Sequence, residues 1–123
     1  MNHRHVTIAA DLTQGKSFSV NLNVPWPSIM TVRQITYAHN GTDGPAMIWT
    51  GFAPDAGIIG SFYDSISVSP QTRFHIQKAL LGTFQMKILD VDLDIADQNF
   101  GGHLFITLEF EPAIEKVELK LNH

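Results

Sequence analysis

The chain contains no cysteine among its 123 residues. Disulfides, thiolate metal ligands and cysteine nucleophiles are therefore excluded, and the redox compartment stays undetermined. Charge is also scarce, because Asp, Glu, Lys and Arg make up 16% of the sequence, against about 25% in an average globular domain. A surface with so few charges predicts that other subunits cover part of it.

Three further absences exclude two classes of partner and a targeting signal. The formal net charge is −4 and the basic residues are dispersed singly, so the sequence offers no basic stripe for nucleic acid. No run approaches the roughly 20 apolar residues of a membrane span. The first residues lead directly into a strand pattern and lack the apolar segment of a signal peptide. We therefore expect no nucleic-acid partner, no membrane span and no secretion signal.

The most regular feature of the sequence is an alternation of apolar and polar residues. From His5 to Leu12 every second residue from Val6 on is apolar, and the alternation resumes over Phe18–Val24 after a turn at Thr13–Lys16. Because side chains alternate between the two faces of a strand, these segments predict a half-buried antiparallel hairpin. The polar face of its second strand consists of Ser17, Ser19, Asn21 and Asn23.

Further short strand patterns follow, separated by Gly, Pro, Asn and Asp. Asn40-Gly41 predicts a hairpin turn, and we favour this over a glycosylation acceptor at Asn40-Gly41-Thr42. Residues 77–81 contain helix formers but are too few for a helix, so we expect a strand-to-turn connection there. The remaining strands are expected at residues 30–38, 46–52, 58–62, 65–68, 73–77, 83–92, 103–111 and 117–121.

We expect these ten segments to yield eight or nine short strands, and that number at near-regular spacing is typical of an all-β sandwich or barrel. No repeat, low-complexity run or interdomain linker divides the chain. We therefore expect a single domain over residues 1–123, built as an antiparallel β-sandwich of the eight-stranded jelly-roll type.

No group of residues in the sequence predicts a metal site or a catalytic site. Asp90, Asp92 and Asp94 would share one face of a strand and suit Ca²⁺, but no second segment supplies further ligands, so a solvated face is favoured. His3 and His5 are half of a zinc site at most, since no cysteine or nearby carboxylate completes it. No nucleophile motif accompanies the scattered histidines. We expect no catalytic residues, no metal and no cofactor.

Several aromatic residues fall at strand ends or in loops instead of on the apolar strand faces. They could form an exposed patch for protein contacts or for stacking on sugars, or they could plug the open ends of the sandwich. The candidate interface residues are Trp26, Phe52, Phe62, Tyr63 and Phe100, together with Asn21 from the polar strand face.

Four segments occur in an order that resembles a known class of proteins. They are Ser61–Asp64, Ser69–Phe74, Gly82–Asp90 and Gly102–Phe110, and the strand Met30–Asn40 fits with them. The succession is similar to that in small single jelly-roll structural proteins of DNA viruses, which supply pentons, minor capsid proteins and spike heads.

This resemblance implies a non-enzymatic capsid subunit located in the virion. Its expected partners are other capsid proteins and further copies of itself, in a cyclic homo-oligomer of three or five. The alternative function is a carbohydrate-binding or receptor-binding β-sandwich module, which would use the loop aromatics to bind glycans.

Overall fold

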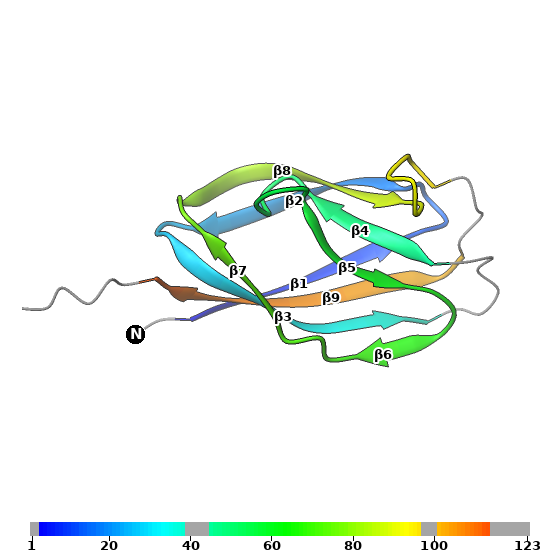
Figure 1. Ribbon diagram of the computed structural model, residues 1–123, viewed down its shortest axis with the longest axis horizontal. Coiled ribbons are helices and arrows are strands. Elements are labelled where there is room, and N and C mark those ends of the chain that lie inside the picture. Colours follow the sequence, from blue (N-terminus) through cyan, green and yellow to red (C-terminus); the bar gives the residue numbers. More distant parts are fainter. Residues whose placement is uncertain (1–2, 39–44, 97–100, 114–123) are drawn as a thin grey trace, which may run out of the picture.

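The computed structural model describes residues 3–38, 45–96 and 101–113, and this part of the chain forms two antiparallel sheets packed face to face (Figure 1). No residue in those ranges is helical. The strands are β1 (Arg4–Asp11), β2 (Ser17–Val24), β3 (Ser28–Tyr37), β4 (Ala46–Thr50), β5 (Ile58–Phe62), β6 (Ile66–Val68), β7 (Thr72–Ile76), β8 (Leu80–Leu89) and β9 (His103–Pro112).

The strand pairing is nested. One sheet has the order β1-β9-β3-β6, with β7 also paired to β3, and the other has the order β2-β8-β4-β5. The first strand therefore pairs with the last, the second with the last but one, and so on inwards to the β4–β5 hairpin. This is the pairing of one long hairpin rolled into two sheets, as in double-sheet Greek-key sandwiches. The expected all-β antiparallel sandwich is confirmed.

The described residues form nine strands, not eight, because two short strands share one neighbour. β6 and β7 both pair with β3, and the chain between them passes through Gln71, whose φ is 58°. The Gln71 N–H donates to the Val32 carbonyl at 2.9 Å, so the break is held against β3.

Several predicted strand boundaries were wrong by two or three residues, including the start of the strand expected at 30–38, which begins at Ser28. The strand expected at 83–92 begins at Leu80 and ends at Leu89, because Leu80 pairs with Val24 and the chain turns at Asp90. The strand expected at 46–52 ends at Thr50. The Asn40-Gly41 turn and the strand expected at 117–121 lie outside the described residues.

The core lies between the sheets and is built from the inward rows of both. A β-bulge in β3 between Val32 and Gln34 resets its alternation, so that Val32 and Ile35 both point inwards. The same bulge leaves Arg33 and Gln34 exposed on the outer face. The largest fully buried side chains are Met30, Ile35, Tyr37, Ile48, Ile59, Leu80, Met86, Ile88, Leu104, Ile106, Leu108 and Phe110.

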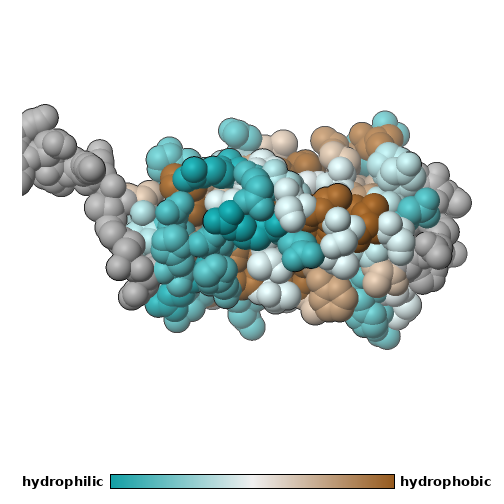
Figure 2. Space-filling view, turned by 90° about the horizontal axis from the view of Figure 1, so that it is seen from below, coloured by the Kyte–Doolittle hydropathy of each residue, from teal (hydrophilic) through white to brown (hydrophobic). Residues whose placement is uncertain are grey.

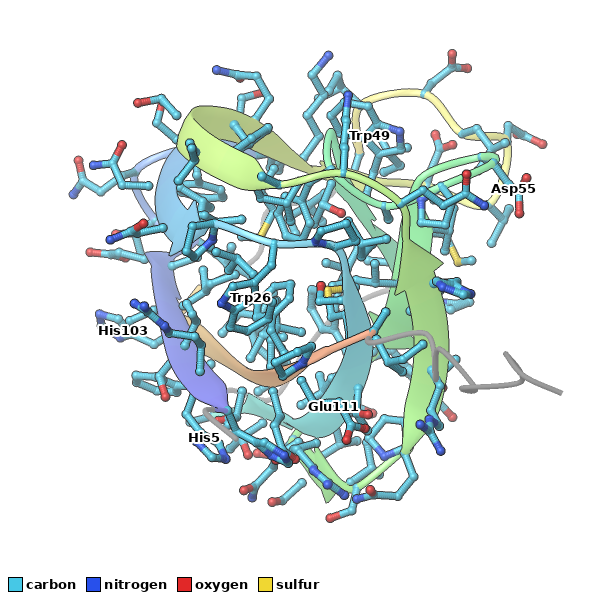
Figure 3. All side chains as sticks on the ribbon, turned by 90° about the vertical axis from the view of Figure 1, so that its left-hand side faces the viewer. His5, Trp26, Trp49, Asp55, His103 and Glu111 are labelled. Carbon is cyan, nitrogen blue, oxygen red and sulfur yellow. The ribbon has the colours of Figure 1, made fainter. Side chains whose placement is uncertain are left out.

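Trp26 is placed at one end of the sandwich. It follows β2, is half-buried and packs against the core cluster. Seen along the long axis, it lies between the two sheets (Figure 3). Trp26 therefore plugs this end of the sandwich, which was one of the two roles expected for the loop aromatics.

The loop after β4 packs closely against Trp49 of that strand at the position of Gly57. Its φ is +83°, and a Cβ atom there would lie 2.3 Å from the indole nitrogen of Trp49. Gly82 has a φ of +108° but open space around it.

We expect Gly82→Ala to cost about 1–2 kcal/mol of unfolding free energy through backbone strain. Gly57→Ala should cost roughly 1–3 kcal/mol more, because overpacking adds to the strain. Chemical denaturation of both variants measures the difference, and equal losses would contradict the packing argument.

Candidate functional site on the outer sheet faces

A group of charged side chains gathers on the outer face of the five-stranded sheet. Strand register places His5 opposite Glu109, and Arg33 reaches the same carboxylate from β3. His3 Nδ1 lies 2.5 Å from Glu109 Oε2, Arg33 Nε donates to Oε1 at 2.5 Å, and His5 Nε2 lies 3.6 Å from Oε2. Together with Glu111 and Arg73, these residues are named the Glu109 cluster.

Glu111 extends the cluster along β9. Arg73 Nη2 lies 3.3 Å from its Oε1, and His3 Nε2 lies 3.8 Å from its Oε2. The imidazole of His3 is therefore placed between two carboxylates. Figure 3 shows His5 and Glu111 at the same outer margin of the sandwich, on the side away from Trp49.

Glu109 is the least exposed member of the cluster, with 10% of its side chain accessible. A carboxylate in such a place needs partners, because an unpaired buried charge is costly. Hydrogen bonds with His3 and from Arg33 lower the pKa of the Glu109 carboxyl below its ordinary value. Glu109 is therefore ionised at neutral pH and holds three strands together on this face.

The expectation that no carboxylate lies near His3 and His5 was wrong. Glu109 is more than a hundred positions away in sequence, and the pairing of β1 with β9 brings it to the two histidines. Within the described residues no group of three or more His, Asp or Glu side chains has a metal-binding arrangement. The cluster is thus a set of ion pairs and hydrogen bonds.

The three alternating aspartates do not share a strand face, contrary to one expectation. β8 ends before Asp90, whose Oδ1 accepts the backbone N–H groups of Asp92 at 2.9 Å and Asp94 at 3.1 Å. Leu93 between them has a φ of 68°. Asp90 therefore organises a turn, as aspartate commonly does through bonds to nearby N–H groups.

The outer face of the four-stranded sheet differs in its lack of charge. Its exposed side chains on β2 and β8 are hydroxyls, amides and one leucine, and Asn21 accepts a 2.6 Å hydrogen bond from Thr83. Lys87 is the charged residue here, and its ammonium lies 5.0 Å from the centre of the Trp49 ring. We name the following set the low-charge face: Ser17, Ser19, Asn21, Asn23, Leu81, Thr83, Gln85, Lys87 and Trp49.

The candidate interface residues are divided between core and surface. Phe52 and Phe62 are buried, at 5% and 2% exposure, so they are removed from the candidate contacts. The Phe52 ring packs 5.8 Å from that of Phe84, and Phe62 packs 4.8 Å from Tyr37, because the loop and strand end that carry them fold inwards. Tyr63 is 53% exposed, and Asn21 is exposed on the low-charge face. Phe100 lies outside the described residues.

Phe105 is an exposed aromatic that the loop-based selection missed. It is 38% exposed on β9, with its ring stacked on His103 at a centroid distance of 6.0 Å. The alternation of β9 predicts this outward position, since Leu104 and Ile106 point into the core.

Seen from below in Figure 2, hydrophilic residues gather toward the end with the chain termini, and hydrophobic residues toward the middle and the other end.

Aspartates gather in the turns at the end of the sandwich opposite the two termini (Figure 1). β1 and β8 both run toward this end, and the turn between β5 and β6 also lies there. The one lysine of these turns is Lys16. We name this set, drawn from the described turns, the acidic end: Asp11, Asp64, Asp90, Asp92 and Asp94.

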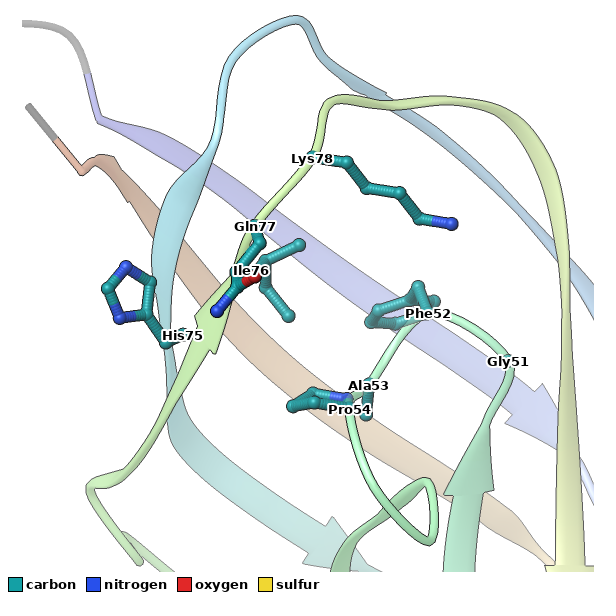
Figure 4. A pocket seen from close by; sticks show the side chains of 8 residues that line it. All are labelled: Gly51, Phe52, Ala53, Pro54, His75, Ile76, Gln77 and Lys78. Carbon is teal, nitrogen blue, oxygen red and sulfur yellow. The ribbon is translucent and has the colours of Figure 1, made fainter.

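A recess of about 410 Å³ lies between the loop after β4 and the segment that joins β7 to β8 (Figure 4). It is lined by Gly51, Phe52, Ala53, Pro54, His75, Ile76, Gln77 and Lys78. His75 points away from the other lining side chains in Figure 4, and no carboxylate is among them. The recess therefore lacks the histidine–carboxylate pair that general acid–base chemistry commonly uses.

No protein family and no curated protein sequence matches this chain. Among solved structures, the crystal structure of the Drosophila NLP-core is similar, with a TM-score of 0.52 over 90% of this chain and 99% of that one. The two sequences are 11% identical, so the likeness shows a shared fold. That crystal structure is described as giving insight into pentamer formation and histone binding.

The capsid function expected from the sequence is corrected by this comparison. A solved structure that shares the fold, the Drosophila NLP-core, is described in terms of pentamer formation and histone binding, which gives no support to the capsid and virion assignment. The function inferred from the strand-and-turn resemblance was wrong. Strand spacing carries information about the sandwich and none about its partners.

The Glu109 cluster predicts how stability depends on pH. Because the pKa of Glu109 is lowered in the folded protein, its contribution is present at neutral pH and is lost as the pH falls through the acid range. We expect Glu109→Gln to lower the Tm at pH 7 by roughly 3–6 °C and to flatten the loss of Tm between pH 7 and pH 3. Thermal melts across this range measure both effects. Glu111→Gln, at a more exposed carboxylate, is the matched control, and a Glu109→Gln profile parallel to the parent's would contradict the assignment.

Proposed function

We propose that this protein, which we take to be non-enzymatic, self-associates into a cyclic homo-oligomer through its low-charge face. The observation that carries the proposal is the composition of that face, where eight of the nine side chains are uncharged. The single cation, Lys87, already lies over the Trp49 ring.

Desolvation explains why this face suits an interface. Hydroxyl and amide groups can exchange water for partners across an interface at a much lower cost than an isolated charge. Leu81 adds an apolar contact at 60% exposure, and Trp49 adds an aromatic one. A specific interface needs roughly 800 Å² per partner, which is the scale of one sheet face.

The likeness to the NLP-core supports a ring of copies, since that protein is described as forming pentamers. The same sandwich is therefore compatible with cyclic assembly. No helix of the described residues is long and apolar enough to cross a membrane. The low overall charge of the sequence, 16% of residues, also favours a partly covered surface.

A charge placed in the middle of the low-charge face tests the proposal. We expect the parent to be an oligomer at micromolar concentration and Asn21→Arg to weaken its association at least tenfold, because the guanidinium must be desolvated. Light scattering coupled to size exclusion gives the mass, and circular dichroism checks the fold. Gln77→Arg, at an exposed position between β7 and β8, is the control and should leave the mass unchanged. A parent that is strictly monomeric would overturn the proposal.

A second candidate function, binding of a basic polypeptide, is favoured by the acidic end. The described turns there carry five aspartates and one lysine, and the chain has a formal net charge of −4. Such a concentration of one charge sign attracts cationic partners and accelerates their association. The NLP-core, which shares the fold, is described as a histone-binding protein.

Neutralising part of the acidic end tests this second function. Asp92→Asn with Asp94→Asn removes two exposed carboxylates and keeps Asp90, which organises the turn. We expect a lysine-rich histone-tail peptide to bind the parent in low salt and the double variant several-fold more weakly. Asp55→Asn, in the loop after β4, is the control. Equal binding by all three proteins, or no binding to the parent, would reject the idea.

A further inference from the structure

The two sides of the sandwich differ in how their sheet edges end. On one side lie β5, with five residues, and the pair β6 and β7, with three and five. These edges are short and broken by Gln71 and Asp64 at positive φ, and the register between β4 and β5 shifts at Trp49. Short, interrupted edges are a common protection against pairing with another chain.

The opposite side has long edges without such protection. β1 and β2 each run for eight residues with an unbroken register, and β2 contains no charge, proline or bulge. No strand of the described chain pairs with the outer edge of either. Alternate N–H and C=O groups of β2 therefore lack a strand partner, which makes this edge a template for another strand.

A groove of about 220 Å³ runs between these two edges. It is lined by Val6, Thr7, Ile8 and Ala9 of β1 and by Ser19, Val20 and Asn21 of β2. Val6, Ile8 and Val20 give it an apolar floor, and none of its lining residues is charged. A strand with one apolar row would fit here, with that row over the groove.

A segment with such an apolar row occurs in the sequence of this chain. In residues 114–123, which lie outside the described residues, Val117, Leu119 and Leu121 alternate with Glu118 and Lys120. The chain leaves the described part at Ala113, whose N–H donates to the Pro27 carbonyl at 2.9 Å. Folding back onto the same molecule needs a turn, but residues 113–121 contain no Gly, Pro, Asn or Asp.

We propose that the segment Val117–Leu121 of one copy adds as a strand to the free edge of β2 in a second copy. Val117, Leu119 and Leu121 then cover the groove, and Glu118 and Lys120 face outwards on the same side as Ser19 and Asn21. The inference rests on the proposed self-association and gives it a specific connection. Each copy donates one strand and accepts one, which is the head-to-tail arrangement of a ring.

The absence of cysteine allows a clean cross-linking test in the full-length chain. Chains with Glu118→Cys or Lys120→Cys are mixed with chains carrying Ser19→Cys on β2, and are oxidised mildly. The control acceptor carries Ser61→Cys, also exposed, on β5 at the other edge of the same sheet. We expect disulfide-linked pairs with Ser19→Cys at least tenfold in excess over those with Ser61→Cys.

Each other outcome rejects a defined part of the argument. Equal linking to both acceptors, or no linking in a parent that is oligomeric, overturns the strand addition and leaves self-association intact. A link formed within one chain of a dilute Glu118→Cys, Ser19→Cys double variant shows that the segment binds its own copy, which also overturns it. A strictly monomeric parent rejects both proposals.

A charge on the apolar row gives an independent readout. Leu119→Asp should raise the concentration needed for half-assembly at least tenfold, because its carboxylate would lie over Val6, Ile8 and Val20. Lys120→Asp places the same group on the outward row and should change that concentration far less. Light scattering over a dilution series measures both variants, and similar effects of the two substitutions would contradict the proposed orientation.

Discussion

The pairing of β1 with β9 is the contact on which the rest of the structure depends. β9 lies between β1 and β3, so the five-stranded sheet cannot close before the last described strand is in place. All four nested pairs except the β4–β5 hairpin join segments far apart in sequence, which predicts slow folding. The same pairing brings Glu109 to His3 and His5, and thus creates the ionic cluster on the outer face.

The sequence predicts single strands well and their neighbours poorly, for a physical reason. Alternation reports which face of a strand is apolar, so the β1–β2 segments and the outward position of Asn21 follow directly from it. It contains nothing about which strands pair. The environment of Glu109 depends on three strands, and no local pattern links Arg33 to a residue in β9. The bulge in β3 is marked in the sequence only by two consecutive polar residues, Arg33 and Gln34, between the inward-pointing Val32 and Ile35.

The same limit explains the errors at the sandwich ends. Phe52 was a candidate contact residue, but the loop that carries it turns inwards and its ring packs against Phe84 and Phe110. Asp90 was expected on a strand, yet its carboxylate serves two N–H groups of a turn. In both places the chain changes direction within a few residues, where a period of two has no meaning.

Cyclic assembly and the acidic end are physically connected. A cyclic operation places the same end of every copy on one rim when the ring axis runs along the long axis of the sandwich. The aspartates of each copy, drawn from turns at one end, then form a continuous negative rim, whereas the Glu109 clusters lie toward the other. The potential of such a rim would grow with the number of copies, so the proposed ring would hold a cationic segment that one subunit attracts too weakly. Free edges on one side and broken edges on the other would give each copy the polarity of a head-to-tail arrangement, in which the rotation between neighbouring copies decides whether a ring closes.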